Sequence, residues 1–514
     1  MSELVQSQVK QNSRIVKILD SIEYLGNKLP SPPMIFIGMS VFIMIISAIL
    51  ASQNQYVLHP GTGDPVYVVN LLSLDSMATN MTSMVTRFTG FAPLGLVLVT
   101  MIGIGLADKT GYITTVIKKA TLKIKPQYLT VSILFIALLA NSAGDAGFIV
   151  LPPIAALAFM LAGRNPIIGI IVAYAGVAGG ISANFMITLL DVLLAGITAE
   201  AVYMIDPELA ATVNPTINWI FMAVSVILLL IVGTFTTEKI IAPRLERDGW
   251  DRPEELDNEV QITPQEIKGI KLANLGLFLY IAFLLFLAIA PIHNGYAFLS
   301  GSQGGLLDRD SVFLTGLVPI ILVMFGLPGL IYGIVTGKIK STHDMVKLVA
   351  SALSEMGGYL VMVFTASQFI ALFGMSNLAI VLAVNGAASI TSIGLSGLGL
   401  FIAFIIFTAV TNLLISSASA QWLILSPIFV PIFLMLGYQP DAIQAAFRIG
   451  DSVTTIVGPL GSFLPLILAL GMKYKKGFGL GSFIAAGFPL TIAFFLAWTG
   501  LFAVWFLFGL PFGV

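Results

Sequence analysis

Nine stretches of this 514-residue chain are each long and apolar enough to cross a membrane as a helix. A helix rises 1.5 Å per residue, so about 20 apolar residues span the roughly 30 Å hydrocarbon core of a bilayer. Only 10% of the residues are charged, against about 25% in soluble globular proteins. We therefore expect an all-α polytopic membrane protein and exclude a nucleic-acid-binding protein, a disordered chain and an ordinary soluble enzyme. The nine stretches are 33–51, 91–107, 166–188, 217–237, 272–292, 311–335, 350–374, 440–470 and 480–510.

Two further apolar segments, about 127–162 and about 397–437, are long enough to enter the membrane twice. Each is interrupted midway by small polar residues, with Asn-Ser-Ala-Gly-Asp-Ala-Gly at 141–147 and Thr-Asn-Leu-Leu-Ile-Ser-Ser-Ala-Ser-Ala-Gln at 411–421. Irregular backbone is tolerated at membrane depth only where it is buried in protein or lines a water-filled cavity. We therefore predict two re-entrant helical hairpins, hairpin 1 and hairpin 2, that turn back at these polar tips.

The basic residues support this arrangement. With the N-terminus in the cytoplasm, nine crossings and two hairpins that return to their own side, 22 of the 25 Lys and Arg residues face the cytoplasm. Arg87 and Arg309 fall outside, and Arg448 falls within a span. Such a bias is the positive-inside pattern of a bacterial inner membrane protein. The polar leader 1–32 is too long and polar for a secretory signal, so we expect it to be retained in the cytoplasm.

An internal repeat relates the two hairpins. An offset of 274 residues aligns them without a gap, and Phe148 then pairs with Trp422. Because an odd number of spans separates the copies, the second should be inverted relative to the first. Inverted repeats with broken helices are typical of secondary transporters, here of the elevator type. The informative identities are Pro153/Pro427, Gly163/Gly437, Pro166/Pro440 and Gly176/Gly450.

This pattern predicts five regions. The cytoplasmic segment 1–32 is followed by a first half, 33–216, with hairpin 1 and a broken helix at 166–188. Scaffold helices and a cytoplasmic loop, 239–271, occupy 217–310. The second half, 311–470, holds hairpin 2 and a broken helix at 440–470, and the last transmembrane helix lies in 471–514.

The broken helix of the second half carries the most informative polar residues. Five of them recur at steps of three or four residues and so share one helical face. A charge at the bilayer centre costs at least ~2.5–3.5 kcal/mol, so it usually faces a cavity or a partner. Arg448 and Asp451 are neighbours on this face and either form a structural ion pair or bind ligands. In the second case Arg448 binds a substrate carboxylate, and Asp451 binds sodium or carries a proton. The five residues are Asp441, Gln444, Arg448, Asp451 and Thr455.

The hairpin tips supply further candidates. Asn412, Ser416, Ser417 and Ser419 offer oxygen ligands for a small cation, or satisfy the backbone of their own tip. Trp422 either stacks on an aromatic ring of the substrate or packs in the core.

The first half offers the corresponding groups. The equivalent first tip contains Asn141, Ser142 and Asp145. Asn184, in the first helix break, is a candidate substrate-binding residue, as are Pro440, Ser417 and Ser419. Asp191 either belongs to a proton path or caps a helix. Glu355 is expected to be an interfacial acid.

Catalytic chemistry is not indicated. The chain has no cysteine, and its three histidines lie in or beside polar loops, so no cofactor or Cys- or His-based metal site is expected. No protease motif and no phosphate-binding loop are present. The sequence predicts a transporter, not an enzyme, whose energy comes from an ion gradient or from a partner chain. An ion channel is the alternative of another class.

Three blocks of sequence resemble the AbgT family of p-aminobenzoyl-glutamate transporters. They are Ile-Ser-Ala-Asn-Phe at 181–185 with 191–200, Ser-Ala-Ser-Ala-Gln-Trp at 417–422 with 427–431, and Phe-Arg-Ile-Gly-Asp-Ser at 447–452. The resemblance implies a homodimer whose protomers each have nine spanning helices and two hairpins. It also implies a small aromatic carboxylate substrate, p-aminobenzoyl-glutamate or a related benzoate, with export of sulfonamide antimetabolites in some members. Another organic anion, such as a dicarboxylate, is the alternative substrate.

The resemblance also implies residue roles. Asp191, Trp422, Pro440, Arg448 and Asp451 match functional positions of the family. Asn412 with Asp451 matches sodium ligands, although the family pattern has an asparagine where this chain has Thr455. On the repeat, we extend the ion site to Asn141 and the ion-coupling groups to Asp145. Sodium and protons remain alternatives as the coupling ion, and the direction of transport is left open.

Overall fold

The protein is built almost entirely from helices. A computed structural model describes residues 30–58, 63–121, 124–140, 145–251, 262–293, 296–308 and 310–514. The two small sheets are antiparallel pairs, with β1 (Tyr56–Leu58) beside β2 (Pro65–Tyr67) and β3 (Pro291–His293) beside β4 (Tyr296–Ala297). The segment 1–32, apart from its last residues, lies outside the described residues.

The helices up to residue 289 follow in chain order. They are α2 (Pro32–Ser52), α3 (Leu74–Thr89), α4 (Ala92–Lys109), α5 (Tyr112–Thr121), η1 (Pro126–Tyr128), α6 (Leu129–Ala140), α7 (Asp145–Leu161), α8 (Pro166–Gly179), α9 (Leu189–Tyr203), α10 (Pro207–Ala210), α11 (Trp219–Thr236), the π-helical turn η3 (Thr237–Ile241), α12 (Ala242–Asp248) and α13 (Pro264–Ile289).

Ten further helices follow from residue 312 onward. Its helices are α14 (Val312–Thr315), α15 (Leu317–Val335), α16 (Thr342–Ser354), α17 (Gly357–Met375), α18 (Leu378–Ser392), α19 (Gly397–Asn412), α20 (Ala418–Met435), α21 (Pro440–Thr455), α22 (Leu464–Tyr474) and α23 (Leu480–Leu507).

The apolar helices confirm a polytopic membrane protein. Within the described ranges, eight helices are long and apolar enough to cross a membrane, or up to ten if each sharply bent pair counts as one span. The helix α13 shows why lipid must surround them, since only 6% of its most apolar window is buried. Side chains such as Phe278, Phe283 and Ile289 are exposed along it. The polar helix α3, which precedes α4, was not predicted, because its composition lacks an apolar run.

The predicted hairpins are present as pairs of packed helices. Hairpin 1 is α6 and α7, and hairpin 2 is α19 and α20, joined through residues 413–417. The tip of hairpin 1, residues 141–144, lies outside the described residues and includes Asn141 and Ser142. The two predicted broken spans are also present: α8 ends at Gly179 before α9, and α21 ends at Thr455 before α22.

Element boundaries and glycine geometry reproduce the repeat. Shifted by 274 residues, α7 and α8 fall on α20 and α21 within one or two residues at each end. Gly163 and Gly437, which end the second arms of the two hairpins, both have positive φ, at 73° and 84°. That backbone conformation favours glycine, so the same residue ends both hairpins in the same way.

Close helix contacts are repeated as well. A Cβ on Gly176 of α8 would lie 2.4 Å from the Ala137 Cβ of α6, and one on Gly450 of α21 would lie 1.8 Å from the Thr408 Oγ1 of α19. These glycines occupy equivalent positions, and each lets a broken helix lie directly against the first arm of its own hairpin.

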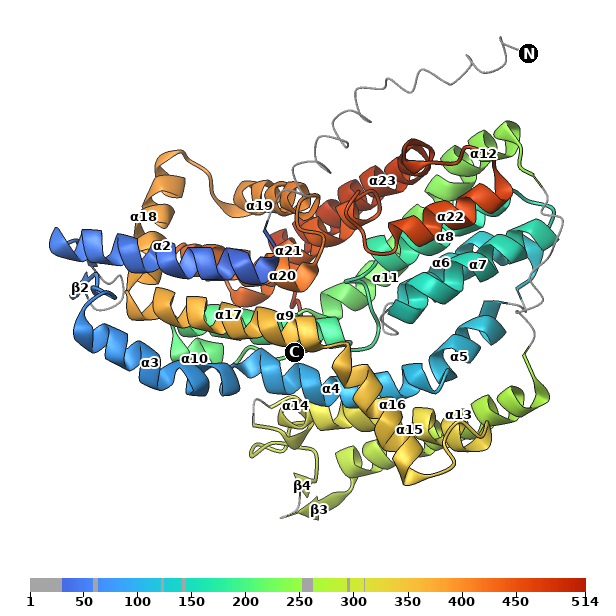
Figure 1. Ribbon diagram of the computed structural model, residues 1–514, viewed down its shortest axis with the longest axis horizontal. Coiled ribbons are helices and arrows are strands. Elements are labelled where there is room, and N and C mark those ends of the chain that lie inside the picture. Colours follow the sequence, from blue (N-terminus) through green and yellow to red (C-terminus); the bar gives the residue numbers. More distant parts are fainter. Residues whose placement is uncertain are drawn as a thin grey trace, which may run out of the picture.

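Helix packing divides into two groups. In one, α4 packs on α15 and α16, α13 packs on α15, and α2 packs on α17. In the other, the hairpins and broken helices pack together with α11 and α23. Figure 1 shows α4, α5, α13 and α15 along the lower side, with hairpin 1, α22 and α23 toward the upper right. The helix α9 contacts both α4 and α20 and so lies between the groups. The division into scaffold and transport core stays a prediction. The helix α11 lies in the region predicted to hold scaffold helices, but it packs with the hairpins.

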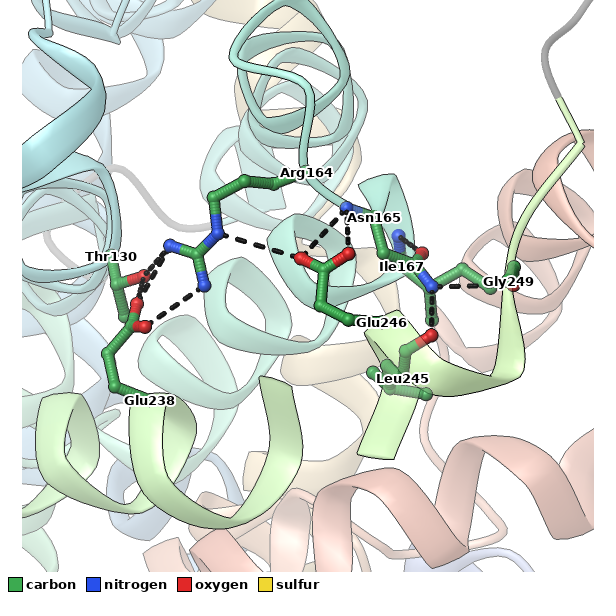
Figure 2. A network of polar contacts seen from close by, with 8 residues as sticks. All are labelled: Thr130, Arg164, Asn165, Ile167, Glu238, Leu245, Glu246 and Gly249. Atoms are coloured by element: carbon green, nitrogen blue, oxygen red, sulfur yellow. Dashed lines mark hydrogen bonds and ion pairs between the residues drawn. The ribbon is translucent and has the colours of Figure 1, made fainter. Parts of the chain in front are cut away.

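A charged network fixes the base of hairpin 1 (Figure 2). Arg164, in the turn between α7 and α8, donates two hydrogen bonds to the Glu238 carboxylate on η3, at 2.8 and 3.0 Å. The neighbouring Asn165 donates its backbone N–H to Glu246 of α12 at 3.2 Å and its amide to the Leu245 carbonyl at 2.7 Å. Because bidentate pairing fixes orientation, this turn is held against the end of α11 through η3 and α12.

The contact at Gly450 gives a stability prediction. In Gly450→Ala the new methyl group must displace the Thr408 hydroxyl or the Ile405 carbonyl oxygen, which would lie 2.5 Å from the added Cβ. Overpacking of this kind typically costs about 1–3 kcal/mol, so the temperature of thermal unfolding in detergent should fall. Gly399→Ala in α19 is the control, because its Cβ would meet only the Leu395 Cδ1 at 3.8 Å. Equal unfolding temperatures for the two variants would contradict this close contact.

Candidate functional site

The two helix breaks meet inside the protein. A Cβ on Gly179, the last residue of α8, would lie 2.4 Å from the Ile456 Cδ1 just past α21. A Cβ on Gly180 would lie equally close to Leu138 of hairpin 1, at 2.2 Å from its Cδ2. At the second break, the Ser416 hydroxyl in the tip of hairpin 2 donates to the Leu460 carbonyl at 3.0 Å. The breaks and both hairpins therefore converge, as the sequence predicts for a transport site.

A buried ion pair joins the two halves at this place. Arg448 Nη2 of α21 lies 2.6 Å from Asp191 Oδ1 of α9, with side-chain exposures of 1% and 9%. The same nitrogen is 3.4 Å from the Ser182 carbonyl in the first break, and Arg448 Nε has no hydrogen-bond partner among the described residues. A structural ion pair within α21 between Arg448 and Asp451, one of the two alternatives for these residues, is thus not the pair observed. The correct partner comes from the other repeat, which local helix spacing cannot reveal.

Asp191 is oriented by its own helix terminus. Its second oxygen, Oδ2, accepts hydrogen bonds from the backbone N–H and the hydroxyl of Thr188, both at 2.7 Å. This capping box places the carboxylate in the first turn of α9, where the helix dipole also favours negative charge. Of the two alternatives for Asp191, the helix cap is the one observed. Its other oxygen meets the buried arginine, and a place in a proton path stays a prediction.

A ring of oxygens surrounds Asn412 one turn further along α21. The Asn412 amide nitrogen lies 2.6 Å from the Asp451 carbonyl oxygen, 3.0 Å from Thr454 Oγ1 and 2.9 Å from Thr455 Oγ1. The Thr454 and Thr455 hydroxyls also donate to backbone carbonyls, those of Ala409 and Asp451. The Asn412 oxygen is buried without a partner among the described residues. The end of the Asn412 side chain thus lies among three oxygen atoms. Hydrogen bonding decides whether its amide nitrogen or its amide oxygen faces them.

Trp422 is a core residue in this conformation. Its side chain is 0% exposed, and its ring stacks on Phe447 with centroids 4.3 Å apart and planes 27° apart. The indole N–H donates to the Thr198 hydroxyl at 2.9 Å. Of the two alternatives for Trp422, packing is therefore the one observed. Thr198 was not singled out in the sequence, although it follows Asp191 by seven residues, about two helical turns on the same face.

The other predicted site residues are spread around this centre. Ser417 caps α20 through Ala420 N–H, and its hydroxyl lies 3.2 Å from that of Ser419. Asn184 is buried and donates to the Ile181 carbonyl within the first break at 3.3 Å. Pro440 is the first residue of α21, about two turns from Arg448.

Three acidic or tip candidates remain. Asp145 begins α7, but its side chain belongs with Asn141 outside the part that is described. Glu355 forms an ion pair with Lys109 at 2.5 Å and is 55% exposed, as expected for an interfacial acid. In the described chain no three His, Asp or Glu side chains gather as metal ligands, so a cation here depends on amide, hydroxyl and carbonyl oxygens.

The arrangement defines the class of protein. Apolar spans surround two hairpins and two broken helices, with a buried guanidinium and carboxylate where they meet, and this is the architecture of membrane transporters. The chain belongs to the AbgT family: the model of the AbgT putative transporter family matches residues 17–514. It is therefore a membrane transporter and not an enzyme, as predicted.

Relatives agree over the whole length. The p-aminobenzoyl-glutamate transport protein of Escherichia coli K12 is 35% identical over 515 residues, covering 99% of this chain and 98% of the relative. The YdaH transporter of Alcanivorax borkumensis superposes with a TM-score of 0.89 at 35% identity, covering 94% of this chain and 100% of that one. Neisseria gonorrhoeae MtrF, described as illuminating a class of antimetabolite efflux pumps, gives 0.87 at 38% identity, with 95% and 98% covered.

The buried pair gives a prediction about coupling between residues. Removing one partner leaves an unpaired buried charge, which typically costs about 3–5 kcal/mol, whereas replacing both with apolar residues is often neutral. Asp191→Leu and Arg448→Met should each lower the unfolding temperature in detergent, and the double variant should recover much of the loss. Additive losses in the double variant would mean that the two charges do not interact.

Proposed function

We propose that this protein transports p-aminobenzoyl-glutamate or a related benzoate or sulfonamide compound across the inner membrane, coupled to an ion gradient. The observation that carries the proposal is the ion pair between Arg448 and Asp191 where the helix breaks meet. A guanidinium in this position suits a carboxylate ligand, because its planar fork can donate two parallel hydrogen bonds. The choice of substrate class is supported by two relatives, the p-aminobenzoyl-glutamate transport protein of Escherichia coli and the antimetabolite efflux pump of Neisseria gonorrhoeae.

Arg448 exchanges partners in this mechanism. In the conformation described, Asp191 occupies Arg448 Nη2, while Arg448 Nε has no partner within the described chain. A substrate carboxylate binds by replacing Asp191 Oδ1, which then takes a proton, while Asp191 Oδ2 stays bonded to Thr188. When the coupling ion is this proton, substrate and ion act on the same pair of side chains, and such a differential effect is what coupling requires.

The ring around Asn412 is the proposed sodium site. Turning the Asn412 amide would bring its oxygen toward three other oxygens, which is favourable only when a cation lies among them. Asn412 and the Asp451 carbonyl, with Thr454 and Thr455, would then hold sodium through hard oxygen ligands. The threonine at position 455 supplies one oxygen, as a side-chain amide at that position would. Protons carried by Asp451, Asp191 or Asp145 are the alternative coupling ion.

The motion and assembly follow the same reasoning. Hairpins 1 and 2 with α8 and α21 move as the transport core, in an elevator-type cycle, against the group that contains α4, α13, α15 and α16. The protein is a homodimer in the inner membrane with its N-terminus in the cytoplasm. The distribution of Lys and Arg supports this orientation.

A flux experiment tests the function. In vesicles reconstituted with the full chain, labelled p-aminobenzoyl-glutamate should show counterflow, and Arg448→Ala should abolish it by removing the carboxylate-binding group. Asp191→Asn should bind substrate more tightly, because the competing charge is gone, yet turn over more slowly. Arg247→Ala, on an exposed arginine of α12, is the control and should transport normally.

The outcomes separate the candidate functions. Near-normal counterflow in Arg448→Ala would refute the role of this arginine. Counterflow of a dicarboxylate in place of the benzoate would change the substrate, and ion currents much faster than carrier turnover would indicate a channel.

Sodium binding is tested separately by thermal unfolding. A ligand at 100 times its Kd stabilises the folded state by about 2.7 kcal/mol, so sodium chloride should raise the unfolding temperature above that in choline chloride. Asn412→Ala should remove the difference, while Asn385→Ala, on an exposed residue of α18, should keep it. A sodium-dependent shift that survives in Asn412→Ala would place the cation elsewhere.

A further inference from the structure

A second polar contact lies between the two helices that carry the ion pair. Thr198 of α9 donates to the Gln444 side-chain oxygen of α21 at 2.5 Å, and accepts the Trp422 indole N–H at 2.9 Å. The Gln444 nitrogen donates to the Asn218 oxygen at 2.8 Å, and the Asn218 nitrogen donates to the Asp441 carbonyl at 2.8 Å. Trp422, Thr198, Gln444 and Asn218 are at most 1% exposed, and we call them the neutral clamp.

The neutral clamp and the ion pair join the same helices at two levels. Thr198 follows Asp191 by seven residues on α9, and Gln444 precedes Arg448 by four residues on α21. At 3.6 residues per turn, these contacts lie about two turns and about one turn from the charged contact. Two contacts at different heights fix the separation of a helix pair and also its rotation, whereas one contact leaves rotation free.

The hydrogen bonds of the clamp are directional. The Thr198 hydroxyl has one hydrogen, for which the Gln444 oxygen and the Leu194 carbonyl at 2.9 Å are both acceptors, and its lone pairs accept the indole N–H. Gln444 accepts with its oxygen and donates with its nitrogen to different residues, so a flipped amide would turn its oxygen toward the Asn218 oxygen and lose that bond. A buried network in which every member has a partner restricts how its side chains can be arranged.

We propose that Thr198, Gln444 and Asn218 are positioning residues that hold α9 and α21 in register while Arg448 exchanges Asp191 for a substrate carboxylate. This inference rests on the proposed function. When the charged contact opens, the neutral clamp is the polar contact that remains between the two helices. It contains no group that titrates, so it persists in either charge state of Asp191.

The test compares two ligands that differ in charge. Binding of p-aminobenzoate and of its neutral ethyl ester is measured on the purified full chain. Thr198→Val removes the hydroxyl at constant side-chain shape, and should weaken p-aminobenzoate binding about tenfold, equivalent to about 1.4 kcal/mol. Binding of the ester should be nearly unchanged, because it makes no charged contact with Arg448. Thr198→Ser restores the hydroxyl and should restore carboxylate affinity.

Control variants separate positioning from a general loss of structure. Thr499→Val makes the same change at a buried threonine of α23 whose hydroxyl has no partner within the described residues, and should leave both affinities unchanged. Asn218→Ser weakens the far end of the clamp without contacting Trp422, and should reproduce the selective loss even if Thr198→Val folds poorly.

Two results would overturn the inference. Equal weakening of both ligands, or unchanged p-aminobenzoate binding in Thr198→Val and Asn218→Ser, would leave the clamp a purely structural network. If the unaltered protein binds neither ligand, the proposed function fails and this inference fails with it.

Discussion

A guanidinium and a carboxylate buried among membrane-spanning helices set the conditions for the rest of this structure. Neither charge is tolerated there alone, so Arg448 and Asp191 must meet, although they lie on helices of different repeats. Their meeting requires α8 to end, and α9 to begin, inside the protein, where Thr188 caps α9. The broken backbone is in turn tolerated because the hairpins enclose it. One electrostatic requirement thus accounts for the break, the cap and the convergence of elements.

Close backbone approach is the second requirement, and glycines meet it in both copies. Gly176 and Gly450 occupy equivalent positions and bring α8 and α21 onto the first arms of their hairpins. Gly163 and Gly437 end the second arms with the same backbone geometry. These glycines keep the shape of the unit constant, while the polar residues proposed to bind and position ligands differ between the copies.

The sequence was sufficient for the architecture but not for the contacts within it. The length of an apolar run and its polar interruptions predict spans and hairpins, because the polarity of each residue reflects whether lipid or a polar environment surrounds it. The partner of Arg448 was not predictable in this way, since helix spacing points to Asp451, whereas Asp191 lies far away in the chain. The position of Trp422 beside a hairpin tip makes it a candidate from the sequence alone. Its burial against Phe447 was not predictable, because it depends on how the helices pack. The polar helix α3 carries no apolar run, so hydropathy passes over it.

One difference between the copies bears on the stoichiometry of energy coupling. Asn412, at the centre of the oxygen ring, has Leu138 as its counterpart in hairpin 1, and Gly180 packs directly against that leucine. After duplication only one copy has this amide, so the proposed ring would serve a single cation per protomer. In the proposed mechanism the second copy binds the driving ion, and the first copy offers an apolar contact at the equivalent position. The proposed ring would therefore contribute one positive charge to each turnover.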